Sequence, residues 1–74
     1  MGLRELREAA VLTQMELAER AGVSADAIRD IENGRVQPRP RTLRKIAEAL
    51  GINPVELRAR LHAAEEAPRG KAAA

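Results

Sequence analysis

The sequence predicts a small all-α domain of five short helices, and three observations support this prediction. Residues that favour helix N-termini are followed by apolar residues three and four positions apart, which is the spacing of one helix face. Glycines follow the ends of several of these apolar patterns, as is common just past a helix C-terminus. The 74 residues suffice for one domain. We expect it to occupy residues 1–64, with a flexible tail at 65–74 that has no large apolar side chain.

Residues 3–21 predict the first two helices. Leu3, Leu6 and Ala10 share one face of the first helix. Thr13 is a favourable N-cap for the second helix, and with Glu16 it forms a capping box, in which each side chain bonds a backbone N–H that the helix end leaves free. The apolar face of this second helix consists of Leu17, Ala18 and Ala21.

Residues 22–34 predict a tight turn and a third helix. Gly22 ends the second helix, and Ser24 is the N-cap of the third. Asn33 and Gly34 both tolerate left-handed backbone angles, so they end it. Its apolar residues are Ala27, Ile28 and Ile31. Helices of about two turns are not stable alone, so the remaining helices must pack against this pair.

Residues 35–61 predict a loop and two further helices. Pro38 and Pro40 disfavour helix before them, and Pro40 suits the first turn of the fourth helix. Arg39 stands at the preceding N-cap position, where it is a poor cap. Gly51 ends the fourth helix, and Asn53 begins the fifth. The apolar residues are Leu43, Ile46, Ala47 and Leu50 in the fourth helix and Val55, Leu57 and Leu61 in the fifth.

The composition excludes several classes of protein. The chain has no Cys, which excludes disulfides and thiolate metal sites, and no aromatic residue on which bases could stack. It has neither an apolar run of membrane-spanning length nor the apolar centre of a signal peptide, which indicates a cytoplasmic protein. The net charge of +2 is unevenly distributed, since residues 14–33 carry five acids and two arginines and residues 34–45 carry five basic residues and no acid.

A pattern that begins in residues 12–34 continues in register towards the end of the fifth helix. It consists of Gln14, Leu17, Ala18, Ala21-Gly22-Val23-Ser24, Ile28, Ile31-Glu32-Asn33-Gly34, Pro38, Thr42-Leu43, Ile46-Ala47, Ala49-Leu50-Gly51, Pro54 and Leu57. On these residues the chain resembles the Xre family of bacterial regulators, which includes phage repressors and Cro. The resemblance covers nearly all of residues 3–61 and implies a lambda-repressor-like fold with a helix-turn-helix at helices two and three. Where the family usually has Gly, this chain has Val11, so we expect that turn either to differ or to be strained.

The resemblance also implies DNA binding, in which phosphate contacts fix the register and base contacts give specificity. The start of the third helix would enter the major groove, where the matching base-reading positions are Ala25, Asp26, Arg29 and Asp30. The matching phosphate-contacting positions are Gln14, Asn33, Arg35, Arg39 and Arg41. For the arginines the alternative is a solvated basic surface. The aspartates depart from the family, because Asp repels phosphate even where it accepts a hydrogen bond from cytosine, and Asp26 can instead simply stabilise the helix N-terminus.

Two structural roles follow from the same resemblance. Arg7 and Glu32 match an ion pair that ties the first helix to the end of the third. Relatives often dimerise through the fifth helix and the preceding loop, and the apolar residues there exceed what one core-facing stripe needs. The predicted dimer interface consists of Ile52, Val55, Leu57 and Leu61. The predicted function is a sequence-specific transcriptional regulator that binds a palindromic operator in double-stranded DNA as a homodimer, without a cofactor.

An alternative from another class is a protein-interaction module on the same fold, antitoxin-like or adaptor-like, whose acidic third helix docks on a toxin or another regulator. An enzyme is not supported, because His62 is the only His and Ser24, the only Ser, is expected to cap a helix. His62 lies near the end of the fifth helix, where a cation suits the helix dipole. Asp26 and Asp30 lie one helical turn apart, but without His, Cys or a third acid nearby they are better interpreted as a solvated acidic face than as metal ligands.

Overall fold

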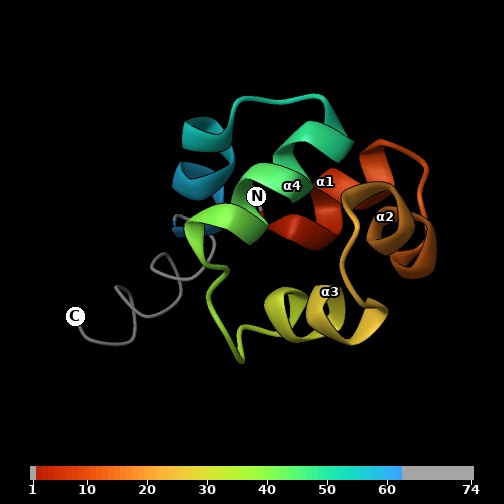
Figure 1. Cartoon of the computed structure of the whole chain (residues 1–74). Helices are drawn as coiled ribbons and strands as arrows, with labels where there is room; N and C mark the ends of the chain where they lie inside the picture. Colours follow the sequence, from red (N-terminus) through yellow and green to blue (C-terminus); the bar gives the residue numbers. More distant parts are fainter. Residues whose placement is uncertain (1, 63–74) are drawn as a thin grey trace.

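The computed structural model describes residues 2–62, and these fold into five helices with no strand among them. The helices are α1 (Leu3–Ala9), α2 (Gln14–Ala21), α3 (Ala25–Glu32), α4 (Pro40–Leu50) and a terminal helical segment at 54–62 (Figure 1). The predicted all-α, five-helix architecture is therefore confirmed. The predicted tail at 65–74, and the last two residues of the predicted domain, lie outside the described residues.

One apolar core joins the five helices, and each helix contributes one of its most deeply buried side chains. These side chains are Leu3, Leu17, Ile28, Ile46 and Leu57. α2 lies at the centre of the arrangement, because it packs against both α3 and α4. No polar or charged residue is buried among the described residues, so the core consists of aliphatic side chains alone. In this arrangement α3 keeps one face on the core and lies along one side of the molecule (Figure 1).

Local caps close the start of α2 and the turn between α2 and α3. Thr13 Oγ1 accepts a 3.0 Å hydrogen bond from the Glu16 backbone N–H, and the Glu16 carboxylate accepts one of 2.9 Å from the Thr13 N–H. The hydrogen bond from the Thr13 N–H, with a smaller contribution from the Thr13 side chain, holds the pKa of Glu16 below its ordinary value. Gly22 has a φ of 73° at the end of α2, and Ser24 Oγ accepts a 3.0 Å bond from the Ala27 N–H at the start of α3. Bonds between residues close in sequence therefore set where α2 begins and ends and where α3 begins.

Val11 adopts the left-handed conformation that the sequence led us to consider. Its φ is 59°, and it is the one non-glycine residue with a positive φ in the described part of the chain. The next N–H, that of Leu12, donates to the Arg7 carbonyl at 3.1 Å, which closes the end of α1. The turn keeps the usual geometry, and valine carries the strain of adopting it.

The prediction for the terminal helix requires correction. Leu57 has no exposed surface and Leu61 is 8% exposed, so both belong to the core of this protomer and are not available to a partner. Ile52 is also partly buried against that core. Val55, at 77% exposure, is the one member of the predicted dimer interface whose side chain is free on the surface. With no aromatic residue in the chain, a core of this size needs the aliphatic residues of its last helix.

Candidate DNA interface

The outer face of α3 carries charged side chains that pair with one another. Asp26 and Arg29 are both well exposed, and Asp26 Oδ1 lies 3.3 Å from an Arg29 guanidinium nitrogen. Asp30 lies one turn further on, where its carboxylate is 3.9 Å from the guanidinium of Arg35 in the following loop. Ala25, at the start of the helix, is partly buried against the core, so it presents only part of its methyl group. The structure thus places three of the four predicted base-reading residues on an accessible face.

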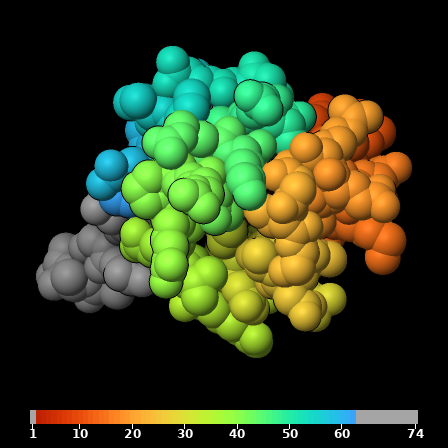
Figure 2. Space-filling view, in the orientation of Figure 1, coloured from red at the N-terminus to blue at the C-terminus, as the bar shows by residue number. Residues whose placement is uncertain are grey.

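The segment after α3 exposes the predicted phosphate-contacting cations. Arg35, Arg39 and Arg41 are all exposed, as is Asn33 at the end of the helix. Within residues 2–62, neither Arg39 nor Arg41 lies within ion-pair distance of an acid. Figure 2 shows this segment next to α3 on the same side of the molecule. The segment with these arginines therefore lies beside α3, and Arg35 approaches Asp30 of that helix.

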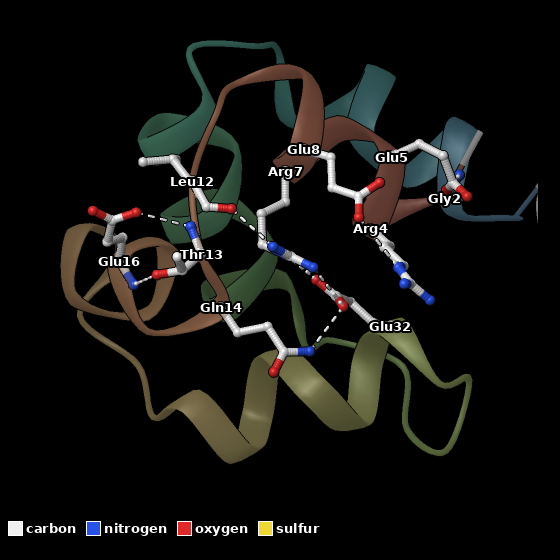
Figure 3. Close-up of polar contacts among 10 residues, drawn as sticks. All are labelled: Gly2, Arg4, Glu5, Arg7, Glu8, Leu12, Thr13, Gln14, Glu16 and Glu32. Atoms are coloured by element: carbon white, nitrogen blue, oxygen red, sulfur yellow. Dashed lines mark hydrogen bonds and ion pairs between the residues drawn. The ribbon is translucent and has the colours of Figure 1, made fainter.

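A half-buried polar network holds the end of α3 against α1 and α2 (Figure 3). Arg7 Nε donates to Glu32 Oε2 at 2.6 Å, and the two side chains are 12% and 4% exposed. A second Arg7 nitrogen donates to the Leu12 carbonyl at 2.8 Å. The hydrogen bond to Glu32 raises the pKa of Arg7 above its ordinary value, so the guanidinium stays charged. Gln14 completes the network, because its Nε2 donates to Glu32 Oε1 at 3.0 Å.

Comparison with known proteins identifies the fold to which this surface belongs. A family described as "Helix-turn-helix domain" matches residues 2–61. The chain belongs to the helix-turn-helix domain family. The resemblance to phage repressors that the sequence suggested is confirmed, since the relatives of this helix-turn-helix domain include an immunity repressor protein of Bacillus phage phi105.

Three relatives define the extent of the similarity. The HTH-type transcriptional repressor RghR of Bacillus subtilis is 55% identical over 51 residues, which are 68% of this chain and 38% of RghR. The phage phi105 immunity repressor is 42% identical over 50 residues, which are 68% of this chain and 35% of that protein. An uncharacterized HTH-type transcriptional regulator of Methanothermobacter thermautotrophicus is 44% identical over 54 residues, which are 73% of this chain and 78% of that regulator. The chain thus spans little more than a third of the first two relatives. No solved structure matches it significantly.

Two features of this helix-turn-helix surface were not predicted from the sequence. One is the bond from Gln14 to Glu32, which joins residues 18 positions apart and has no signal in local spacing. The other is the pairing of each aspartate of α3 with an arginine. Asp26 and Arg29 are three residues apart on one helix, a spacing that allows such a pair, whereas Asp30 pairs with an arginine in the following loop. The described residues contain no cluster of three His, Asp or Glu that could hold a metal ion. Among those residues, no helix has the length and apolar character needed to cross a membrane.

Proposed function

We propose that this domain binds double-stranded DNA as the DNA-binding part of a transcriptional regulator, with α3 in the major groove. The observation that carries the proposal is the exposed, arginine-containing segment that follows α3 and lies beside it in Figure 2. Major-groove recognition by a helix-turn-helix places the N-terminal part of the second helix against base edges, with phosphate contacts on either side. The names of its relatives as transcriptional repressors and regulators support the same function.

Within this proposal the exposed side chains have distinct roles. Arg29 donates two hydrogen bonds to a guanine, and Ala25 touches a thymine methyl group with the part of its side chain that is accessible. Arg35, Arg39 and Arg41 bind phosphates, together with Asn33 and with Gln14 at the start of α2. Arg7 and Glu32 hold α3 in place and do not contact DNA.

We further propose that the protein acts as a homodimer on a palindromic operator. In this dimer the contact surface is centred on the exposed Val55, beside a groove of about 370 Å³ between the start of α4 and the terminal helical segment. The groove is lined by Pro40, Leu43, Arg44, Pro54, Val55 and Arg58. A two-fold dimer would place the recognition helices about 34 Å apart, which is one turn of DNA.

Sedimentation tests this dimer. Val55→Asp should give a monomer at concentrations where the unmodified protein is dimeric, because a charge is buried at the interface. Met15→Asp is the matched control, since Met15 is 65% exposed on α2, away from the groove, and should leave the dimer intact. A protein that stays monomeric at several hundred micromolar, with and without DNA, would exclude the homodimer.

In vitro selection from a random DNA pool, followed by titration at several salt concentrations, tests DNA binding. Affinity should fall steeply as salt rises, because DNA binding releases about 0.9 counterion per phosphate neutralised. Asp30→Asn removes a negative charge that faces Arg35, so it should raise affinity for random duplex and weaken any preference for cytosine at one position. Absence of DNA binding by both forms at low salt would favour the protein-interaction module instead.

A further inference from the structure

The Glu32 carboxylate is placed where an acid is unfavourable unless it has a specific role. It is the last residue of α3, and a negative charge at a helix C-terminus is repelled by the helix dipole. Its side chain is only 4% exposed, so water stabilises it little. Arg7 compensates the charge, but an ion pair with Arg7 does not by itself require the contact that the second carboxylate oxygen makes with Gln14.

The contact with Glu32 fixes which way round the Gln14 amide lies. An ionised carboxylate can only accept hydrogen bonds, so the NH2 group of Gln14 must face it and the amide oxygen must point away. Figure 3 shows the Gln14 side chain reaching from the start of α2 to Glu32 in this way. The opposite orientation would bring two oxygens together. Glu32 therefore removes both the amide flip and much of the side-chain freedom that an exposed glutamine would have.

One donor of Gln14 remains for a ligand. The NH2 group carries two hydrogens, one of which is bonded to Glu32, and no described residue accepts the other. Gln14 is the first residue of α2 and is only partly buried, so the second N–H is close to the positive end of that helix. Arg7 balances the charge of Glu32, so this carboxylate repels an approaching phosphate little. The phosphate therefore meets the neutral Gln14 amide, whose second N–H already points outward.

We propose that Glu32 is a positioning residue for DNA binding, which orients Gln14 so that its second N–H meets a DNA phosphate. This inference rests on the proposed DNA-binding function. It gives the half-buried pair of Arg7 and Glu32 a role beyond stability, because the same carboxylate that attaches the end of α3 to α1 also aligns the phosphate contact at the start of α2. Binding of the backbone at α2 and placement of the recognition helix are thereby joined through one side chain.

A double-mutant cycle on random-sequence 20-base-pair duplex at low salt tests the inference. In the unmodified protein, Gln14→Ala should weaken binding about tenfold, as expected for one hydrogen bond to a charged group. In the Glu32→Gln background the same change should cost only about two- to threefold, because the amide of residue 32 no longer dictates the orientation of Gln14. Glu19→Gln is the matched control, since it removes an exposed acid of α2 and should leave the tenfold effect unchanged. Equal effects of Gln14→Ala in the Glu32→Gln and unmodified backgrounds would overturn the inference.

Side-chain NMR of the unmodified protein gives a second measurement, which does not require Glu32→Gln to fold. The chain has only two glutamines, so the amide protons of Gln14 are readily assigned. One of them should exchange slowly in the free protein and the other should become slow only when the duplex is added. Two fast-exchanging protons in the free protein would overturn the positioning role. A restrained amide in a protein that binds no duplex would instead show that the proposed DNA binding, and the phosphate contact with it, is wrong.

Discussion

Replacement of Val11 by glycine should stabilise the domain. The helices α1 to α4 all end in the same turn, in which a residue with left-handed backbone angles is followed by an N–H that bonds the carbonyl five residues back. The residues with left-handed angles are Val11, Gly22, Gly34 and Gly51, with φ values of 59°, 73°, 72° and 75°. Three of the four turns use glycine, which adopts these angles without a steric penalty. The turn after α1 is therefore the one that carries backbone strain.

The size of the effect follows from three terms. Left-handed angles cost an L-residue about 1–2 kcal/mol, and a β-branched side chain lies towards the upper end of that range. Glycine loses about 0.4–1 kcal/mol because it gives the unfolded chain more freedom. The side chain of Val11 is 86% exposed, so its removal costs little packing. The net gain in the free energy of unfolding should be about 1 kcal/mol, which corresponds to about 4–8 °C in Tm for a domain of this size.

Urea unfolding followed by far-UV circular dichroism measures this gain, since a chain without Trp or Tyr offers no intrinsic fluorescence probe. Val36→Gly is the control, because Val36 is a partly exposed loop valine that does not have a positive φ. It should lose stability through the glycine entropy term and through the packing of its half-buried side chain, with no strain to relieve. Val11→Ala keeps the Cβ atom, so it should recover only a small part of the strain. If Val11→Gly lowers the free energy of unfolding as much as Val36→Gly does, the turn after α1 stores no strain.

The remaining predictions concern the proposed interface and its caps. Arg35→Ala and Arg39→Ala should weaken binding to all DNA sequences alike, and each should reduce the salt slope by about one. Arg29→Ala should instead relax the preference at one base pair by about 1–3 kcal/mol. Titration against selected and random duplexes separates these outcomes, and an unchanged selected motif would exclude Arg29 as a base reader. Arg39 caps α4 without a side-chain hydrogen bond, so Arg39→Ser should raise the free energy of unfolding by about 0.5–1 kcal/mol while it weakens DNA binding; a loss of stability would contradict this. The hydrogen bonds from Thr13 hold the pKa of Glu16 below its ordinary value of 4.5, so their contribution to stability is present above that pH and is lost as the pH falls through the folded pKa. Acid titration of the unfolding midpoint should show a smaller loss for Glu16→Gln than for the unmodified protein.

Features that depend on neighbours in sequence were predictable. The caps at Thr13 and Ser24 and the helix ends at Gly22 and Gly51 all lie where the sequence placed them. Each depends on a bond between residues three to five positions apart, so the chemistry is visible in the sequence itself. The weak cap at Arg39 was visible for the same reason.

Features that depend on packing were not predictable to the same extent. The apolar residues of the terminal helix were assigned to a dimer interface, yet Leu57 and Leu61 face the core, as helical neighbours four residues apart can do together. Val55 has the same apolar character and is on the surface. Hydrophobicity alone does not distinguish these positions, because the direction of each side chain is set by the docking of the helix on α4 and the rest of the core.

From the sequence, the two aspartates of α3 are expected to oppose DNA binding. Their arginine partners suggest that they influence specificity instead. Arg29 and Arg35 each lie beside an acid of this helix, and exposed ion pairs of this kind are worth about 0–1 kcal/mol. A bidentate contact favours guanine over an incorrect base by about 1–3 kcal/mol, so guanine offsets the loss of the Asp26–Arg29 pair better than an incorrect base does. On the proposed function, the two aspartates therefore lower the affinity for random DNA more than the affinity for the operator. This surface gains sequence specificity at the expense of total affinity.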